Sequence, residues 1–317
     1  MALAIGVDVG GTKVAAGVVD PDGTVLARAR VPSPSTDPAA ISAAIVACVA
    51  QLRLDHPEVV AVGVGAAGFI DAARAVVLFA PNLAWRNERL RDTLRERLGL
   101  PVVVENDGNA MAWAEYRFGA GRGVQDLCAV TVGTGIGGGI VLSGALYRGH
   151  SGIAGEFGHM RVVPGGRRCG CGNRGCWEQY ASGRALVHEA REIAAVAPAS
   201  AARLLELADG PAGSITGPEV TEAAREGDMT ARECFAVVGR WLGQGMADVA
   251  ATLDPGRFVV GGGVSEAGEL LLTPAREAYA AALTGRGHRP VAEIVAAQLG
   301  NEAGLVGAAD LARSGGS

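Results

Sequence analysis

Four residues with metal-binding side chains lie close together between His159 and Cys176. The stretch GEFGHMRVVPGGRRCGCGNRGCWE, residues 155–178, contains three of the six cysteines in the chain and one of its five histidines. A disulfide, a metal site and a catalytic centre are each compatible with such a cluster. His159, Cys169, Cys171 and Cys176 offer one nitrogen and three sulfurs, which complete a tetrahedral set for Zn²⁺ and leave no open position. We therefore expect one structural zinc ion per chain in this loop.

Composition and charge narrow the class of protein. The chain has 317 residues and a formal net charge of −5, so it lacks the basic character of a nucleic-acid-binding protein. The apolar start MALAIGVDVGG has no basic flank, and the apolar run AAIVACVAQL is too short to span a bilayer. We expect a soluble, cytoplasmic protein, in which clustered cysteines favour a metal over disulfides. Cys48, Cys128 and Cys234 lie in apolar runs and are expected in the core.

Two glycine-rich turns are candidates for phosphate binding. DVGGTK begins at Asp8, and GTGIGGG begins at Gly133. The second turn fits the dinucleotide fingerprint G-x-G-x-x-G, but a strand and not a helix follows it, which argues against a Rossmann loop. Without Cβ atoms, the amides of either hairpin can converge on an anion, although ordinary hairpin turns have the same composition. Lys13 is available as a counter-charge and Asp8 as a ligand for Mg²⁺.

Regular elements are predicted on both sides of these turns. Three β-branched runs separated by tight turns indicate an antiparallel meander, and amphipathic stretches and buried runs indicate alternating helices and strands after it. The predicted elements of the first half are strands at 5–9, 13–19 and 24–30, a helix at 39–54, a strand at 59–68, a helix at 87–99, a strand at 101–105 and a helix at 109–118.

The strand–turn–strand pattern of the N-terminus recurs in the middle of the chain. LCAVTVGTGIGGGIVLSGALYRG can be laid on AIGVDVGGTKVAAGVVDPDGTVLAR with Gly133 on Gly10. Each copy opens a half-chain of alternating strands and helices. The repeat therefore predicts a duplicated α/β unit whose halves face each other across a cleft.

Asp107 is the candidate general base. It follows the apolar strand VVVE and precedes a helix, so it is either a helix N-cap or a carboxylate that accepts a proton from a substrate hydroxyl. The two roles do not exclude each other. Phosphoryl transfer needs positioning, charge neutralisation and one base, which this arrangement can supply.

Together, these motifs resemble those of a known protein family. DVGGTK, END, GTGIGGG, GEFGHM and CGCGNRGCWE, in this order, are similar to those of the ROK family of bacterial sugar kinases and repressors. The resemblance covers essentially the whole chain and is closest to the family's ATP-dependent glucokinases of actinobacterial type. One departure is Ala67 before Gly68, where such kinases often have proline.

The resemblance implies a hexokinase/actin-like ATPase fold of class α/β, with two ribonuclease-H-like lobes that close on ATP and sugar. The small lobe would be residues 1–107, joined by the C-terminal helix at about 300–317, and the large lobe residues 108–299. Asp107 would be the base toward the sugar 6-hydroxyl, and zinc would fix His159. The implied sugar-binding residues are Gly68, Asn106, Asp107, Glu156, His159 and Glu178. The implied residues for ATP and Mg²⁺ are Asp8, Gly10, Gly11, Thr12, Lys13, Gly133, Thr134, Gly135, Gly137, Gly138, Gly139, Gly261, Gly262 and Gly263.

The implied activity is transfer of the ATP γ-phosphoryl group to the 6-hydroxyl of glucose. Fructose, mannose, allose and N-acetylated amino sugars are alternative substrates, and polyphosphate is an alternative donor. A sugar-sensing regulatory role is the alternative from another class. Repressors of the family carry an N-terminal helix-turn-helix, whereas this sequence starts at the first predicted strand, so no nucleic-acid or membrane partner is expected. A homodimer or homotetramer is expected.

Overall fold

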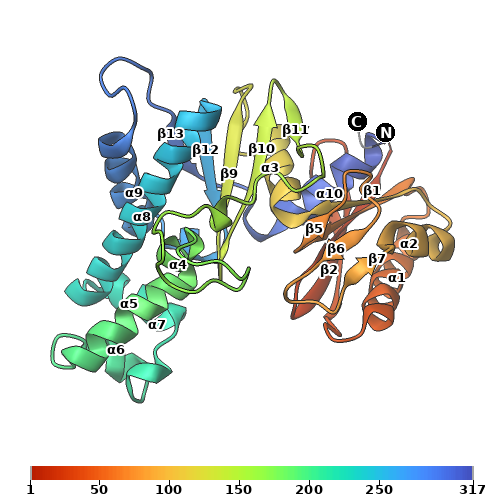
Figure 1. The fold of residues 1–317 in the computed structure, drawn as a ribbon. Coiled ribbons are helices and arrows are strands. Elements are labelled where there is room, and N and C mark those ends of the chain that lie inside the picture. Colours follow the sequence, from red (N-terminus) through yellow and green to blue (C-terminus); the bar gives the residue numbers. More distant parts are fainter. Residues whose placement is uncertain (1, 316–317) are drawn as a thin grey trace. The chain divides into compact units, whose positions relative to one another are not determined.

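The structure is a computed structural model in which residues 2–315 are described (Figure 1). Contacts within the chain divide it into two compact units. Unit 1 comprises the residues up to Ala129, Gly139–Gly155 and the residues from Ala297 onward, and unit 2 comprises Val130–Gly138 and Glu156–Ala296. This division differs from the predicted lobes of residues 1–107 with about 300–317 and 108–299, because the helix after Asn106 packs within unit 1.

Unit 1 is built on a five-stranded sheet with the order β3-β2-β1-β4-β8. The three N-terminal strands form the expected antiparallel meander, and β1 then pairs with β4, and β4 with β8, in parallel. Parallel neighbours end at the same edge of a sheet, so the residues after β1, β4 and β8 lie along one edge. The strands are β1 Ala4–Val9, β2 Lys13–Val19, β3 Val25–Pro32, β4 Ala61–Ala66 and β8 Val102–Asn106.

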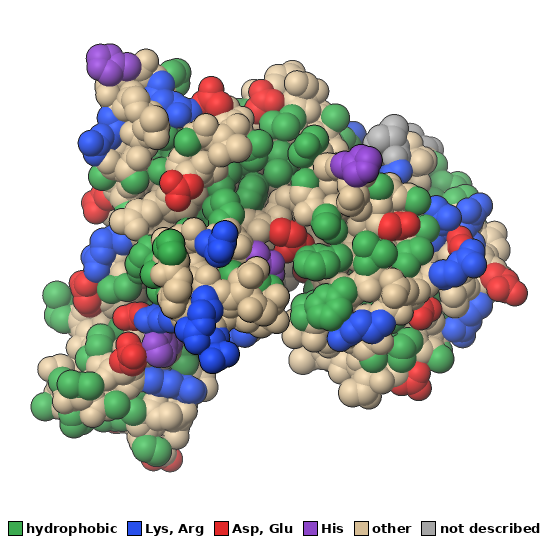
Figure 2. Space-filling view, viewed as in Figure 1, with side chains coloured by type: hydrophobic (Ala, Val, Ile, Leu, Met, Phe, Trp, Pro, Cys, Tyr) green, Lys and Arg blue, Asp and Glu red, His purple; other side chains and the backbone are tan. Residues whose placement is uncertain are grey.

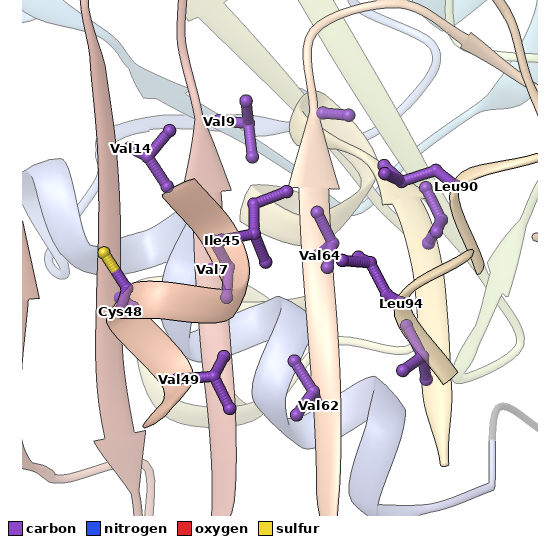
Figure 3. Close-up of a cluster of buried hydrophobic side chains, with 14 of the residues drawn as sticks. Val7, Val9, Val14, Ile45, Cys48, Val49, Val62, Val64, Leu90 and Leu94 are labelled. Atoms are coloured by element: carbon purple, nitrogen blue, oxygen red, sulfur yellow. The ribbon is translucent and has the colours of Figure 1, made fainter. Parts of the chain in front are cut away.

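Two helices cover one face of this sheet. Ile45, Cys48 and Val49 of α1 (Pro38–Asp55) point toward valines of the strands, as Figure 3 shows. Helix α2 (Leu90–Leu98) adds a second row of buried leucines and ends at Gly99, which has a left-handed conformation as its C-cap. The buried residues of α1 recur every three to four positions. They therefore form one face of the helix, and this face packs against the sheet.

Helix α1 is longer than the ten-residue apolar run within it. At 18 residues it is the one helix in the described part of the chain that is long and apolar enough to cross a membrane by length and composition. Core helices of globular proteins pass the same test, and the buried face of α1 belongs to the core of unit 1.

The C-terminal helix α10 (Ala303–Arg313) covers the opposite face of the sheet. Glycines make this approach unusually close. A Cβ atom on Gly6 or Gly63 would overlap the carbonyl groups of Leu305 or Ala308, and one on Gly307 would overlap the carbonyl of Ala110 in α3 (Asp107–Phe118). Helices α10 and α3 therefore lie in backbone contact, and α3 is held firmly in unit 1.

A smaller antiparallel sheet completes unit 1. It consists of β5 Phe69–Ile70, β6 Val77–Phe79 and β7 Arg86–Glu88, and the sequence patterns did not predict it. These strands are only two or three residues long, which is too short for a period-2 pattern to be recognised.

The second large sheet has the order β11-β10-β9-β12-β13. It repeats the meander of the N-terminus, as the sequence repeat predicted, and the boundary between the units runs through β9 and β10. Its strands are β9 Leu127–Val132, β10 Ile136–Leu142, β11 Ala145–Tyr147, β12 Arg257–Gly261 and β13 Glu293–Ala296.

Unit 2 is mostly helical after the cysteine-rich loop. The 25-residue helix α8 (Met229–Leu253) packs closely along α9 (Glu269–Ala282), because Gly239 and Gly243 of α8 bring the two backbones together. The other helices of unit 2 are α4 Glu178–Ala181, α5 Gly183–Val196, α6 Ala202–Leu207 and α7 Gly217–Glu226, with short 3₁₀ turns at η1 Phe157–His159, η2 Ala212–Ser214 and η3 Gly263–Ala267. A further 3₁₀ turn, η4 Gly300–Glu302, precedes α10 in unit 1.

Charged side chains of both signs are interspersed over the surface in the view of Figure 2. The chain has 28 Lys and Arg residues against 33 Asp and Glu residues. On this face there is no extended field of one sign, such as a protein that tracks a nucleic-acid backbone presents.

Candidate active site

Two carboxylates lie along the edge of the unit 1 sheet where β1 and β8 end. Asp8 of β1 is level with Gly65 of β4, which is level with Glu105 of β8. Asp107 follows β8 directly and is the first residue of α3. Both Asp8 and Asp107 are half-buried. The parallel register of three strands thus places two acidic groups together that are about a hundred residues apart in the sequence.

The structure separates the two sequence-based roles of Asp107. The N-cap of α3 is Asn106, whose side chain accepts a hydrogen bond from Asn109 N at 3.0 Å. Helix α3 therefore starts two residues earlier than the predicted 109–118, and the capping interaction belongs to the neighbour of Asp107. The carboxylate of Asp107 is not needed as the cap, which leaves it available for chemistry.

The electrostatics of the two carboxylates are linked. Burial raises the pKa of Asp8 from 3.8 to about 6; the charge of Asp107 adds to the rise, and Lys13 opposes it. Burial also raises the pKa of Asp107, while hydrogen bonds from the amides of Gly108 and Asp107 itself act in the opposite direction. A raised pKa strengthens a carboxylate as a proton acceptor near neutral pH. A close pair of carboxylates also favours a bound cation, and oxygen donors of this kind suit Mg²⁺.

Asn106 connects this edge to Gly68. The Asn106 Nδ2 group donates to the carbonyl oxygen of Gly68 at 3.1 Å and keeps one further N–H for another partner. Glycine is needed at position 68, because a Cβ atom there would lie 2.5 Å from the carbonyl oxygen of Phe79.

The first glycine turn forms a tight hairpin between β1 and β2. The Gly10 amide donates to the carbonyl of Lys13 at 3.0 Å, and the carbonyl of Thr12 accepts from Ser33. Cβ atoms on Gly10 or Gly11 would meet no atom closer than 3.5 Å. These two glycines therefore leave open space above the turn.

The four predicted zinc ligands come together in unit 2. The ligand atoms of His159, Cys169, Cys171 and Cys176 lie within 4.8 Å of one another, and all six cysteines of the chain are free. Cys169 Sγ lies 3.6 Å from His159 Nδ1, and Cys171 Sγ lies 3.6 Å from Cys176 Sγ. Two ligands of a tetrahedral zinc ion are about 3.5 to 3.8 Å apart, given Zn–N and Zn–S bonds of about 2.1 and 2.3 Å. The donor set and its spacing fit zinc.

The backbone of this loop is shaped for the cluster. The amide of Gly172 donates to the carbonyl of Cys169 at 3.1 Å, and the amide of Gly175 donates to the carbonyl of Arg167 at 2.8 Å. Gly172 and Gly175 have φ angles of 92° and 78°, a region that other residues rarely adopt. After Cys176, the buried Trp177 packs against Gly245 of α8 and donates its indole N–H to the carbonyl of Trp241 at 2.7 Å.

Glu156, His159 and Glu178 are arranged around the cluster. With Nδ1 facing Cys169, the other ring nitrogen of His159 lies 3.9 Å from Glu156 Oε2. Glu178 is 8% exposed, and its Oε1 lies 3.0 Å from Cys169 Sγ. A Cβ atom on Gly135 would overlap Glu178 Oε2, so Glu178 also lies against the second glycine turn. A zinc ion in this loop would thus bind His159 directly and lie close to Glu178, which contacts the ligand Cys169.

The second glycine turn borders a pocket within unit 2. A cavity of about 1360 Å³ is lined by Gly133, Thr134 and Gly263, by Gly183 and Arg184 at the start of α5, and by further residues of α5 and α7. Cβ atoms on Gly133 and Gly263 would meet nothing within 4 Å. The pocket is roomy for a ligand of nucleotide size, since typical ligand sites occupy about 300 to 1,000 Å³.

The other glycines that were predicted to bind ATP are in contact with neighbouring parts of the chain. Gly137 donates its amide to Thr131 Oγ1, Gly262 has a φ of 86° and lies against Val132, and Gly261 is buried at the end of β12. Gly139 belongs to unit 1 and packs against the backbone of α3. The pocket lining therefore includes Gly133, Thr134 and Gly263 of the predicted set, and Gly138 continues β10.

Three residues near these groups were not selected from the sequence. Arg184 donates through Nε to the carbonyl oxygen of Thr134 at 3.0 Å, which leaves the rest of its guanidinium beside the second glycine turn. Glu105 and Arg148 form a buried ion pair of 2.7 Å. Glu105 lies two residues before Asp107 in the sequence. Only the run SGRAL, in which an arginine follows a glycine at a helix start, was available as a signal for Arg184.

The chain is similar to proteins of one family along nearly its whole length. The family model described as "ROK family" matches residues 4–314. The chain is 54% identical to a glucokinase of Streptomyces coelicolor, with 99% of this chain and 98% of the relative covered. It is similar to the crystal structure of a ROK family glucokinase from Streptomyces griseus in complex with glucose and AMPPNP, with 56% identity, a TM-score of 0.90 and coverage of 98% and 99% of the two chains. A ROK hexokinase from Thermus thermophilus has 34% identity, a TM-score of 0.79 and coverage of 99% and 98%.

The fold is accordingly the hexokinase/actin-like ATPase fold of class α/β, as the motifs predicted. Within that class, the chain belongs to the ROK family.

Proposed function

We propose that this protein is an ATP-dependent glucokinase, which transfers the γ-phosphoryl group of ATP to the 6-hydroxyl of glucose. The observation that carries the proposal is the similarity along the whole chain to the Streptomyces griseus glucokinase, whose structure contains glucose and an ATP analogue. The geometry supports it independently, because the chain supplies a carboxylate base, two glycine turns, a pocket of nucleotide size and a fixed group of polar residues.

In the proposed reaction, Asp107 accepts the proton of the sugar 6-hydroxyl as the hydroxyl oxygen attacks the γ-phosphorus. The bond between the γ-phosphorus and the β–γ bridging oxygen breaks, and ADP leaves. The raised pKa of Asp107 suits this role, since a base is most effective when its pKa approaches the working pH. Asn106 and Gly68 are proposed to bind sugar hydroxyls. Glu156, His159 and Glu178 are also proposed to bind sugar hydroxyls and to fix the orientation of the ring.

The nucleotide is proposed to bind at the glycine turns. Gly10, Gly11, Thr12 and Lys13 would contact phosphates in unit 1. In unit 2, Gly133 and Thr134 would do the same, with Gly263 near the adenosine. Mg²⁺, when bound, neutralises phosphate charge, and Asp8 is proposed to help hold it. Arg184 adds a positive charge beside Thr134.

Zinc is proposed to be structural. Its four ligands fill a tetrahedral set, so the ion supplies no chemistry of its own and instead holds the loop that carries His159 and precedes Glu178. The free cysteines that these ligands require, and the use of ATP, support a cytoplasmic location. The homodimer or homotetramer stays a prediction.

A coupled-enzyme assay tests the proposed function. Purified protein is supplied with Mg²⁺ and either ATP or polyphosphate, and with glucose, fructose, mannose, allose and N-acetylated amino sugars in turn. We expect the highest kcat/KM for glucose with ATP, and a kcat of the Asp107→Asn variant that is lower by at least about 100-fold. A preference of more than tenfold for another sugar would reassign the substrate, and absence of turnover with every sugar would refute the kinase assignment.

A further inference from the structure

We propose that the buried ion pair between Arg148 and Glu105 positions Asp107, so that Arg148 and Glu105 are positioning residues for phosphoryl transfer. This inference rests on the proposed function in one respect, since it takes Asp107 as the base. It assigns a task to two residues that touch neither the pocket nor the zinc cluster.

Glu105 lies at the end of β8, directly before the residues of the site. Its side chain is 2% exposed and accepts three hydrogen bonds: from Arg148 Nε at 2.7 Å, from the amide of Asn106 at 3.1 Å and from Asn109 Nδ2 at 3.0 Å. These donors use both carboxylate oxygens of Glu105: Oε2 accepts from Arg148, and Oε1 accepts from Asn106 and Asn109. The orientation of the carboxylate is therefore fixed.

Two of the three donors flank Asp107 in the chain. Asn106 precedes it and Asn109 lies two residues beyond it, and these two are joined by the helix cap from Asn109 N to Asn106 Oδ1 at 3.0 Å. Glu105 thus holds the backbone on one side of Asp107 and a side chain on the other. The direction in which the Asp107 carboxylate leaves the first turn of α3 follows from this arrangement.

Arg148 is the hydrogen-bonded cation of this buried carboxylate. A buried charge is costly unless an opposite charge and hydrogen bonds compensate it. Arg148 supplies a positive charge from the loop after β11, with its own side chain 16% exposed, and the charge of Arg74 also acts on Glu105. Without Arg148, Oε2 of Glu105 loses the hydrogen bond that fixes it, and the carboxylate is held only by Asn106 and Asn109.

The loop that carries Arg148 is itself well fixed. Its ends are joined by a hydrogen bond from the amide of Ala154 to the carbonyl of Arg148 at 3.0 Å. Gly152 lies so close to residues 70–72 that a Cβ atom would come within 2.7 Å of Ala72 N. Arg148 therefore reaches Glu105 from a firm base and not from a free loop.

A second buried ion pair in unit 1 provides a matched control. Arg313 and Asp310 of α10 are 3.0 Å apart, with side chains that are 13% and 5% exposed. Arg313 also donates to the carbonyls of Val19 and Asp20. This pair resembles Arg148–Glu105 in burial and length. Arg313 contacts the start of the β2–β3 turn, whereas Asp310 also accepts from Trp113 Nε1 at 2.9 Å and pairs with Arg117 at 3.4 Å, both in the later turns of α3. Replacing Arg313 leaves those two contacts of Asp310 in place. The loss of the Arg313–Asp310 pair should lower stability without a specific effect on Asp107.

The test is a double-mutant cycle on the purified full-length chain, with kcat and KM for glucose and ATP measured separately. Arg148→Met and Glu105→Gln each leave one buried charge without its partner, and each should lower kcat by about 10- to 100-fold, because a small displacement of a catalytic group has effects of that order. The KM for ATP should stay within about threefold, since the glycine turns are untouched.

The double variant Arg148→Met/Glu105→Gln should recover at least part of the lost kcat. Both charges of the Arg148–Glu105 pair are absent from it, so neither is left without the other, and the amide oxygen of glutamine can still accept from Asn106 and Asn109. Arg148→Lys should be intermediate, because an ammonium group can pair with Glu105. Arg313→Met, the control, should lower the melting temperature while its kcat stays within about twofold of wild type.

Several outcomes would overturn the inference. One is an unchanged kcat in folded Arg148→Met, and another is a double variant whose loss equals the product of the two single losses. A third is an Arg313→Met variant that loses as much kcat as Arg148→Met. If Arg148→Met does not fold, the same comparison is made with Arg148→Lys, whose kcat must then fall below that of Arg313→Met. Wild-type turnover is measured first with each hexose, so failure of the glucokinase assignment is seen separately and the cycle is run with the sugar that is used.

Discussion

Asp107 in unit 1 and Glu178 in unit 2 are both carboxylates at the first position of a helix, yet the chain holds them in different ways. Asp107 follows a strand in a five-stranded sheet and opens the 12-residue helix α3, which is capped by Asn106. Glu178 opens the four-residue helix α4, whose N-cap makes no side-chain hydrogen bond, and it follows a loop that lacks regular structure. The cysteine and histidine ligands lie in that loop.

The difference indicates which of the two carboxylates a metal ion would support. Asp107 is positioned by the backbone hydrogen bonds of β8 and α3, and these elements form together with the core of unit 1. Near His159 and Glu178 the backbone forms the isolated bridge between Arg161 and Cys176 instead of a strand ladder, so we expect side-chain ligands to add support there. We therefore expect the base to be insensitive to zinc and the proposed sugar-binding groups of unit 2 to depend on it.

Asp107→Asn should lower kcat by about 10²- to 10⁴-fold or more, because a general base is lost. The fold and the affinity for glucose should stay close to wild type, since Asn106 and not Asp107 caps α3. Single-turnover kinetics, calorimetry with glucose and circular dichroism measure the three quantities. A variant that kept more than about a tenth of wild-type turnover would leave Asp107 with no role as the base.

Cys171→Ser should lose zinc and raise the KM for glucose by about 10- to 100-fold, because support for His159 and Glu178 disappears. A serine hydroxyl does not readily ionise to replace the thiolate. Cys171 is exposed, whereas Cys169 also contacts Glu178, so this substitution disturbs the metal with the least direct effect on a sugar-binding residue. Metal analysis should give one zinc per wild-type chain.

The matching control for Cys171→Ser is dichroism in the far ultraviolet, which should stay close to wild type because each unit has its own core. A variant that unfolds without zinc would show that the ion supports unit 2 as a whole and would argue against a local effect on the sugar site.

Gly133→Val should raise the KM for ATP by about tenfold, which corresponds to about 1.4 kcal/mol, within the usual cost of overfilling a site. Gly133 lines the pocket with open space at its Cβ position, so the added methyl groups enter the space proposed for phosphates. Gly135 is unsuitable for this test, because a side chain there would also displace Glu178.

Gly213→Val is the control for Gly133→Val. Gly213 also lies in unit 2 with nothing near its Cβ position, and it does not line the pocket. Its kinetic constants should equal those of wild type. An equal rise of the ATP and glucose constants in Gly133→Val would contradict the assignment of this turn to phosphate.

The last prediction concerns the free energy of unfolding and follows from Asp8. Its pKa is about 6 in the folded chain and 3.8 without the fold, so the folded state holds the proton more tightly. This contribution to stability is fully present below about pH 4 and is lost as the pH rises through 6. At pH 8 the ionised carboxylate then costs at most about 3 kcal/mol.

Asp8→Asn should therefore be more stable than wild type at pH 8 and equally stable near pH 4, while its turnover falls because the proposed Mg²⁺ ligand is gone. Urea unfolding at the two pH values, without Mg²⁺, measures the difference. A variant that is less stable than wild type at pH 8 would show that Asp8 is a structural residue.

Features that depend on short stretches of sequence could be predicted. The β1–β2–β3 meander was marked by β-branched runs and tight turns, the end of α2 by Gly99, and the metal cluster by the spacing of Cys169, Cys171 and Cys176. In each case the physical signal, which is periodicity, turn chemistry or ligand type, lies within some twenty residues.

Features that depend on packing between distant segments could not be predicted. Arg148 reaches Glu105 across 43 positions, and Glu178 lies against Gly135 because of how the loop and hairpin fold together. The division into units was also beyond local patterns, since α3 joins unit 1 through the glycine contact between Gly307 and Ala110. The residues around Arg148 in the sequence form no pattern that indicates Glu105 as its partner. The same is true of Glu178 and Gly135.

The most direct test of the contrast between the two units is the affinity for glucose before and after removal of zinc. Wild-type protein is stripped of metal with a chelator, glucose is titrated by calorimetry, and zinc is then added back. The account predicts that the Kd for glucose rises by about 10- to 100-fold without zinc and returns to its starting value with one zinc per chain. Zinc-free protein that binds glucose with an unchanged Kd would contradict the claim that the metal positions the sugar-binding residues.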